Sequence, residues 1–372
     1  MEKRKWADVL HIVSGKNQKD VQNPNGKYPI YGSGGKMGYA DEYLCEPGTT
    51  IVGRKGTINR PIYVDEPFWN IDTAFGVTPD KGLDSKYLFY FCVHFNFMPL
   101  DKSTGRPSLA KSDLLKIEMP VPSIDEQRRI VSRIEELFSE LDNSVSTLQK
   151  TKEQLAVYRQ AVLKEAFDSV KCVDEGARVK DVCNNIKVGI VIKPTQYYVE
   201  SDGVKAFRNA NVRRNYVDDD NWALISKEGH EKNKKSIVHT NDLVIARSGA
   251  NLGMAAVVPE KCEGYNAIDI VIAELDLKMV DPHYLAYYVN SPYGLHIVNE
   301  YQHGGAQGHL NVKEFGLLPL ILVPISEQKR VVTEIESRLS VCDSIEHTVD
   351  TALQQAEAMR QSILKQAFEG RL

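Results

Sequence analysis

The strongest constraint on the fold is a long segment that the chain contains twice. Residues 126–168 align with residues 327–369 without a gap, at a constant offset of 201, and sixteen of the 43 aligned positions are identical. Both copies follow a Val-Pro dipeptide, at Val121 and at Val323, and each is preceded by a region of globular composition. A repeat on this scale predicts two equivalent structural modules in one chain.

Each copy is predicted to form one long helix. The first contains no Gly or Pro, and apolar residues recur every seven positions in both copies, at Ile134, Leu141, Leu148, Leu155 and Val162 and at Ile335, Cys342, Val349, Ala356 and Ile363. Unbroken heptad spacing favours a coiled coil. The alternative is two unrelated surface helices, each packed on its own domain. Because the two stripes share phase and length, we expect the helices to pair with each other.

The chain connectivity favours an antiparallel pair. A helix of this length spans about 65 Å at roughly 1.5 Å per residue. In an antiparallel pair residues 169–324 leave and rejoin the helices at one end, whereas a parallel pair would require them to bridge the whole length. We therefore expect two globular domains at opposite ends of the pair, related by an approximate two-fold axis.

Residues 1–122 read as a mixed, strand-rich domain in which Gly and Pro separate short apolar runs, followed by a buried helix from Ser85 to Phe97. Residues 169–324 look like a diverged copy of it. Ile51–Gly56 matches Val244–Gly249, and Tyr87–Phe91 matches Tyr284–Tyr288, in the same order. The intervening loops differ, which suggests two related but different targets.

Composition indicates a cytoplasmic globular protein. Hydrophobic residues make up 42% and charged residues 26% of the chain. The six cysteines form no CxxC pair, and we find neither a secretory signal nor an apolar run of membrane-spanning length. The net charge of −4 gives no support for nucleic-acid binding, so any such role must rest on local placement of cations.

Catalytic and metal-binding patterns are not found. The stretch Gly32–Gly38 lacks the spacing of a phosphate-binding loop and has Met37 where a hydroxyl residue would be needed, so we expect a turn. His303 and His309 flank a glycine-rich stretch, but no third ligand candidate is apparent, which favours an ordinary loop. The sequence therefore predicts a chain that is not itself an enzyme.

Basic and amide-rich loops are the candidate DNA-binding sites, since Arg and Lys contact phosphates and guanine while Asn contacts adenine. Ordinary solvated surface is the alternative for each residue. Arg54 and Arg247 stand out, because each follows an apolar run and precedes a glycine, although they could instead pair with Asp72 and Asp269. The full set of candidates is Lys36, Arg54, Lys55, Arg60, Lys102, Arg106, Arg208, Asn209, Arg213, Arg214, Lys234, Lys235 and Arg247.

The two helix-start motifs, Val-Pro-Ser-Ile-Asp-Glu-Gln-Arg-Arg-Ile-Val from Val121 and Val-Pro-Ile-Ser-Glu-Gln-Lys-Arg-Val-Val from Val323, carry a family resemblance. With the long repeat after each, the chain resembles the specificity (S) subunit of bacterial and archaeal Type I restriction-modification enzymes over essentially its whole length. Tyr28–Gly32 is also similar to a segment common in such subunits. The motifs differ by a single-residue indel before Glu126 and Glu327.

The resemblance implies an α+β fold with a pseudo-two-fold internal repeat. Two mixed α/β target-recognition domains would be separated by two long helices that form an antiparallel coiled coil. The expected boundaries are 1–122 for the first recognition domain, 123–168 for the central helical repeat, 169–324 for the second recognition domain and 325–372 for the C-terminal helical repeat.

The resemblance also implies a function and partners. Each recognition domain would read one half of a bipartite, asymmetric site in double-stranded DNA, with the helical pair as the ruler between the halves. Two methyltransferase (M) subunits would supply S-adenosylmethionine chemistry, so this chain would hold no cofactor, and translocase-nuclease (R) subunits would join for cleavage. The rival reading is a non-catalytic coiled-coil scaffold whose two domains bind proteins.

The exposed faces of the helical pair are the candidate docking surfaces for the M subunits, with ordinary solvated helix faces as the alternative. The residues concerned are Arg128, Arg129, Glu135, Glu136, Lys329, Arg330 and Glu336.

Overall fold

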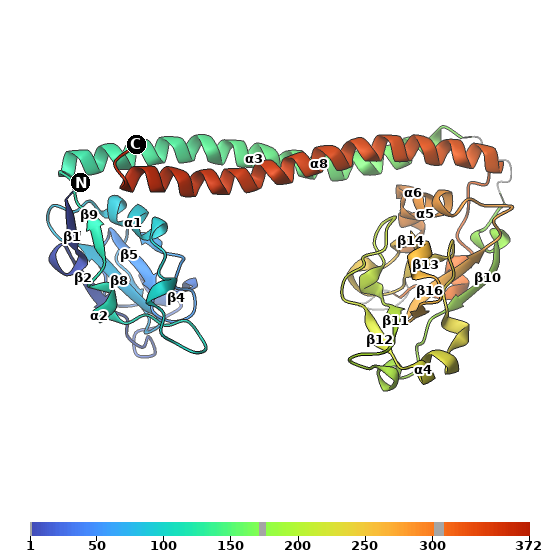
Figure 1. The fold of residues 1–372 in the computed structure, drawn as a ribbon, viewed down its shortest axis with the longest axis horizontal. Coiled ribbons are helices and arrows are strands. Elements are labelled where there is room, and N and C mark those ends of the chain that lie inside the picture. The colour runs from blue at the N-terminus through green and yellow to red at the C-terminus, as the bar shows by residue number, and fades with distance from the viewer. Residues whose placement is uncertain (1, 171–175, 301–308) are drawn as a thin grey trace. The chain divides into compact units, whose positions relative to one another are not determined.

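The computed structural model describes residues 2–170, 176–300 and 309–372. The chain divides into two compact units, which are shown in Figure 1. Unit 1 comprises residues 1–150 and 349–372, and unit 2 comprises residues 151–348. Both long helices run from one unit into the other, so each unit contains a part of both.

The long helices are α3 (Ile124–Asp168) and α8 (Ile325–Phe368), as the repeat predicted. They lie side by side in Figure 1, and ion pairs within each unit show that they run antiparallel. In unit 1 Arg360 pairs with Asp142, and in unit 2 Arg338 Nη2 lies 2.8 Å from Glu165 Oε2. The antiparallel coiled coil is therefore confirmed within each unit, and the alternative of two unrelated surface helices is wrong.

The heptad residues form the seam of this coiled coil. Ile134 and Val162 are fully buried, and Leu141 and Leu155 are at most 9% exposed. In the second copy Cys342, Val349 and Ala356 are similarly buried. Both copies of the heptad stripe are thus buried, as the seam of a coiled coil requires.

Unit 1 contains a four-stranded antiparallel sheet in the order β2 (Leu10–Ser14), β8 (Ala74–Pro79), β5 (Thr49–Gly53) and β6 (Ile62–Val64). A second sheet has the order β4 (Gly35–Ala40), β3 (Tyr28–Gly32) and β7 (Trp69–Asn70), with β3 and β7 parallel. The pair of β1 (Lys3–Lys5) and β9 (Glu118–Pro120) closes the unit, which also holds the helices α1 (Ser85–His94) and α2 (Lys111–Leu114).

Unit 2 repeats the two larger sheets of this plan. Its four-stranded sheet has the order β10 (Cys183–Val188), β16 (Ile270–Leu275), β13 (Leu243–Ala246) and β14 (Ala255–Val257). Its three-stranded sheet has the order β12 (Ala223–Ile225), β11 (Val204–Phe207) and β15 (Asn266–Ala267), again with one parallel pair. The unit also holds α4 (Lys227–Lys232), α5 (Pro282–Asn290), α6 (Pro292–Glu300) and α7 (Val312–Gly316). The predicted α+β fold with an internal repeat is thus confirmed.

Each unit has a hydrophobic core on both faces of its four-stranded sheet, because successive side chains along a central strand point to opposite faces. In unit 1 Val52 packs on the α1 side, while its neighbour Ile51 packs on the opposite side. In unit 2 Leu243 and Ile245 pack towards α5, and Val244 packs on the other face. The short helix α1 or α5 therefore lies between the sheet and the long helices (Figure 1).

The structure refines the local predictions for one helix and one glycine-rich stretch. The helix predicted for Ser85 to Phe97 ends at His94, because the backbone of Phe95 is extended. The glycine-rich stretch after Gly32 is a tight hairpin between β3 and β4, in which Gly35 has a φ of 120°. The candidate ligand His303 lies outside the described residues.

Candidate nucleic-acid interface

Three predicted cations of unit 1 come together on neighbouring loops. Arg54 and Lys55 follow β5, and the backbone N–H of Gly56 donates to Pro107 O at 2.8 Å, beside Arg106. Gly56 has a φ of 83°, and a Cβ there would lie 2.8 Å from Arg106 Nη2. A glycine therefore lets the Arg106 guanidinium pack against this turn. We call Arg54, Lys55 and Arg106 the basic loop cluster.

The basic loop cluster has little internal neutralisation among the described residues. The Arg54 guanidinium lies 5.7 Å from the centre of the Phe75 ring, a cation–π contact that orients it without removing its charge. Arg54 therefore stacks on Phe75 instead of pairing with Asp72. Lys55 and Arg106 are exposed, and their described contacts include no carboxylate. Such a cluster suits phosphate contacts and guanine recognition.

The other candidates of unit 1 are placed differently. Lys36, on β4, donates to the Tyr39 hydroxyl at 2.9 Å, and this hydrogen bond raises the lysine pKa. Lys102 pairs with Asp113 Oδ2 at 2.8 Å, and the bonds from Lys102 and Lys116 lower the pKa of Asp113. Arg60 is exposed on the loop between β5 and β6. Of these three, Lys102 is the one with a described ion pair, although its side chain is 77% exposed.

In unit 2 the residue equivalent to Arg54 has a structural role. Arg247 Nη1 lies 3.3 Å from Asp269 Oδ1, its Nε donates to Leu310 O at 3.2 Å, and its side chain is only 12% exposed. Asn209 completes this network: its Oδ1 accepts from the Arg247 N–H at 2.8 Å, and its Nδ2 donates to Ser248 Oγ at 3.0 Å. Both predicted base readers therefore have their polar groups engaged within the domain.

Carboxylates and carbonyls also engage most other predicted cations of unit 2. Arg213 pairs with Asp218 at 3.0 Å and Lys234 with Glu231 at 2.7 Å, while the Arg208 guanidinium donates to Asn221 O. Lys235 is exposed, and no ion pair is described for it. The two units therefore share a fold but differ in how many of their predicted cations are paired with carboxylates.

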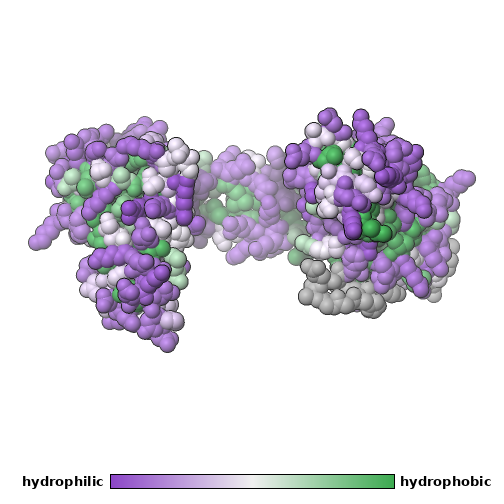
Figure 2. Space-filling model, turned by 90° about the horizontal axis from the view of Figure 1, so that it is seen from below, coloured by the Kyte–Doolittle hydropathy of each residue, from purple (hydrophilic) through white to green (hydrophobic). Residues whose placement is uncertain are grey.

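In Figure 2 the visible face of each unit is mainly hydrophilic.

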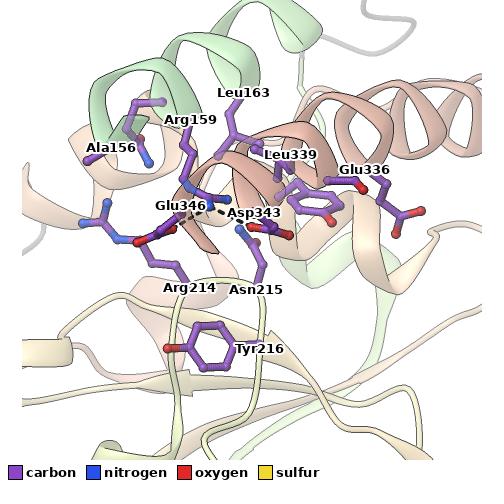
Figure 3. Close-up of a pocket in the computed structure, with 13 residues that line it drawn as sticks. Ala156, Arg159, Leu163, Arg214, Asn215, Tyr216, Glu336, Leu339, Asp343 and Glu346 are labelled. Atoms are coloured by element: carbon purple, nitrogen blue, oxygen red, sulfur yellow. Dashed lines mark hydrogen bonds and ion pairs between the residues drawn. The ribbon is translucent and has the colours of Figure 1, made fainter. Parts of the chain in front are cut away.

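Arg214 lies at a cavity of unit 2, shown in Figure 3. The cavity has a volume of about 690 Å³ and separates α3 and α8 from the loop that joins β11 to β12. Arg159 lies between Asp343 and Glu346, at 2.7 and 2.9 Å, and Glu336 adds a further carboxylate. These carboxylates lower the positive potential around Arg214, which disfavours a phosphate contact there.

The loop at this cavity has no counterpart of similar length in unit 1. It covers residues 208–222, whereas two residues join β3 to β4. Its tip is held by Asn215, which has a φ of 68° and accepts from the buried Asn290 Nδ2 at 2.7 Å. An aligned repeat cannot reveal this loop, because it is one of the segments in which the copies differ.

Sequence reasoning missed two further features. On β11 the Lys205 ammonium lies 5.6 Å from the Trp222 ring centre and 5.7 Å from that of Tyr265, so it is a cation held by aromatic rings. Gln127 and Gln328 are fully buried at the starts of the long helices, although they stand in the repeated helix-start motif. Burial of an amide in both copies could be found only from the structure.

The predicted docking faces of the long helices carry matching ion pairs. Arg129 pairs with Glu126 at 2.8 Å, and Arg330 pairs with Glu327 at 2.7 Å, at equivalent positions of the repeat. Glu135 is bound instead to Lys86 of α1 at 2.7 Å. Arg128 and Lys329 are exposed.

Within residues 2–170, 176–300 and 309–372, no three His, Cys, Asp or Glu side chains gather as a metal site would require. None of the helices described there combines the length and apolarity needed to cross a membrane.

Comparison with curated proteins finds relatives of one kind. The chain is 25% identical over 357 residues to the "Type I restriction enzyme EcoBI specificity subunit" of Escherichia coli, covering 89% of this chain and 75% of that protein. It is 23% identical over 359 residues to a putative Type I restriction enzyme specificity subunit of Haemophilus influenzae, covering 94% and 90%.

Solved structures share the fold. The chain matches a structure described as the "HsdS subunit from Thermoanaerobacter tengcongensis", with a TM-score of 0.55, 16% identity and coverage of 100% and 97%. A structure from work on complex assembly and conformational transition of the type I R-M system matches with a TM-score of 0.75, 16% identity and coverage of 100% and 98%.

The family model named "Type I restriction modification DNA specificity domain" matches residues 1–155 and 175–355, one match for each repeat. Because these matches cover most of the chain, this protein belongs to the Type I restriction modification DNA specificity domain family.

Proposed function

We propose that this chain is the DNA specificity subunit of a Type I restriction-modification complex. Each recognition domain reads one half of a bipartite, asymmetric site in double-stranded DNA. The observation that carries the proposal is the repeated unit itself: the same two sheets and short helix occur twice, each mounted on the same pair of helices, with different loops.

The different loops support two different half-sites. The basic loop cluster of unit 1 offers cations to DNA, whereas unit 2 presents a longer loop between β11 and β12 and a more neutral surface. Bases are read by side chains in the grooves, so a shared framework with different loops gives two different readings. A site assembled in this way is asymmetric.

The chemistry of such a complex belongs to its partners in this proposal. Two M subunits dock on the long helices and hold S-adenosylmethionine, and R subunits join for cleavage. This chain is non-catalytic by itself and holds no cofactor. The exposed residues Arg128 and Lys329 on the two helices are available for docking, whereas Glu135 is held by Lys86.

The helical pair acts as the ruler between the half-sites. Its helices are 45 and 44 residues long, so each spans about 65 Å at roughly 1.5 Å per residue. Successive turns of B-DNA lie about 34–36 Å apart, so helices of this length can set a gap of one to two turns.

A protein-binding scaffold is the second candidate function. The net charge of −4 and the ion-paired cations of unit 2 favour it. The test is to purify the chain with its partner methyltransferase and incubate the complex with DNA and S-adenosylmethionine. We expect adenine methylation at one bipartite sequence and no product from the isolated chain. A complex that shows no sequence preference would favour the scaffold.

A further inference from the structure

A buried glutamine joins each globular unit to the start of a long helix. In unit 1 Gln127, in the first turns of α3, is fully buried. Its Oε1 accepts from the backbone N–H of Asp84 at 2.8 Å. Its Nε2 donates to Gly82 O at 2.9 Å and to Pro122 O at 2.8 Å. One amide therefore connects the segment before α1 to the segment before α3. We call Gln127 with these three hydrogen bonds the glutamine joint of unit 1.

The second copy contains the same joint. Gln328 is also fully buried, and its Oε1 accepts from the Asp281 N–H at 2.8 Å. Its Nε2 donates to Met279 O at 2.9 Å and to Val323 O at 2.8 Å. Two N–H groups pointing at carbonyls and one oxygen pointing at an N–H fit only an amide in this orientation. The loops of the two units have diverged, whereas this arrangement has been kept.

The same aspartates and two tyrosines extend each joint. The Asp84 carboxylate accepts from the N–H groups of Lys86 and Tyr87, both at 3.0 Å, and so caps α1. The Tyr87 hydroxyl donates to Pro120 O at 3.0 Å. In unit 2 Asp281 caps α5 in the same way, and the Tyr284 hydroxyl donates to Ile321 O at 2.8 Å.

The end of the other long helix closes each joint. The Phe368 ring, at the end of α8, lies 5.2 Å from the Tyr87 ring, edge to face. In unit 2 the Phe167 ring, at the end of α3, lies 5.3 Å from the Tyr284 ring. Because each glutamine is fully buried, no solvent can replace a lost partner, and the loss of any of its three hydrogen bonds is costly.

We propose that Gln127 and Gln328 are positioning residues that fix the orientation of each recognition domain on the helical pair and thereby make the complex strict about the spacing of its two half-sites. Neither side chain reads a base. This inference rests on the proposed function, and it concerns the gap between the half-sites instead of their bases.

The test uses the full chain co-expressed with its partner methyltransferase, and methylome sequencing as the readout. The variants are Gln127→Leu and Gln328→Leu, made separately. We expect both half-site sequences to be unchanged. Methylation at sites whose spacer is one base pair too short or too long should rise about tenfold relative to wild type. A tenfold change corresponds to the free energy of about one hydrogen bond.

The controls are Gln154→Leu and Gln355→Leu. These glutamines occupy equivalent positions of the repeat, on the same two helices, but are exposed. The same substitution there should leave spacer selection as in wild type. A change in spacer selection in the controls equal to that in the joint variants would overturn the proposal.

Tyr87→Phe and Tyr284→Phe keep the proposal testable if the leucine variants do not fold. Each removes one hydroxyl bond of the joint and leaves the buried ring in place, so a smaller relaxation in the same direction is expected. Folded variants with wild-type spacer strictness, or variants that change a half-site base, contradict the positioning role. Absence of any bipartite methylation by the wild-type complex would instead refute the proposed function.

Discussion

Arg54 and Arg247 occupy equivalent positions in the two repeats, yet they lie in different surroundings. Their aligned motifs left open whether either arginine would bind DNA or pair with a nearby aspartate. Arg247 pairs with Asp269 and bonds to Leu310 O, whereas Arg54 stacks on Phe75. Asp269, Leu310 and Phe75 lie outside the aligned motifs, so the motifs themselves do not determine the difference.

This contrast predicts different results for the two Arg→Ala substitutions. Arg54→Ala should leave folding intact and weaken the salt dependence of DNA binding. If one phosphate contact is lost, the negative slope of log K against log salt should become smaller in magnitude by about 0.9. Arg247→Ala should destabilise unit 2 by about 1–3 kcal/mol, because Asp269 and Leu310 O lose a largely buried partner. Binding titrations at several salt concentrations and denaturant unfolding measure the two effects. Equal changes in slope with no loss of stability would contradict this assignment.

Asp242 predicts a pH dependence of stability in unit 2. Burial raises the pKa of this carboxyl to about 6, and its Oδ2 accepts from the His239 N–H at 2.8 Å. Because the pKa is raised in the folded state, the folded state binds the proton more tightly, and stability falls as pH rises from about 4 to about 6. Lys187 and Glu274 are the charged groups that face it, along with His239.

We therefore expect Asp242→Asn to melt at a higher temperature than wild type at about pH 8 and at the same temperature at about pH 4. The amide keeps an acceptor for the His239 N–H and carries no charge. Thermal melts of both proteins across this range check the prediction. A variant that is less stable than wild type at every pH would show that the carboxylate stabilises the fold.

At the scale of elements, the long helices were the part that the sequence predicted best. A heptad stripe with no Gly or Pro leaves few alternatives, and α3 and α8 begin and end close to the predicted positions. The coiled-coil partner could be inferred because both stripes have the same phase. The loop over residues 208–222 could not be predicted, since its conformation depends on Asn215 meeting the buried Asn290.

The ruler role of the helices gives a prediction at this scale. Inserting one heptad after Leu148 and one after Val349 adds about 10 Å to each helix while keeping the seam in phase. The preferred spacer should then widen by about three base pairs at about 3.4 Å each. The methylome of cells that express the altered complex measures the spacer. An unchanged spacer in a folded, active complex would contradict the ruler.

At the scale of the whole chain, the protein consists of two similar units that each contain part of both long helices. The sequence predicted the repeat from its periodicity, and it predicted the fold class through the family resemblance that the repeated helix-start motifs carry. It left open whether Arg247 binds DNA or pairs with Asp269, and it could not assign the pairing of Arg213 with Asp218, because that pair depends on the fold of the loop between β11 and β12. It also missed the glutamine joints, since burial of a polar residue is a tertiary property.

The most direct test of two independent recognition domains is a domain exchange. Residues 1–122 are replaced by the first recognition domain of another family member, and the methylome of cells that express the hybrid with the partner methyltransferase is sequenced. Our account predicts that one half of the bipartite site changes, while the other half stays as in wild type. A hybrid that assembles and methylates but changes both halves, or neither, would contradict it.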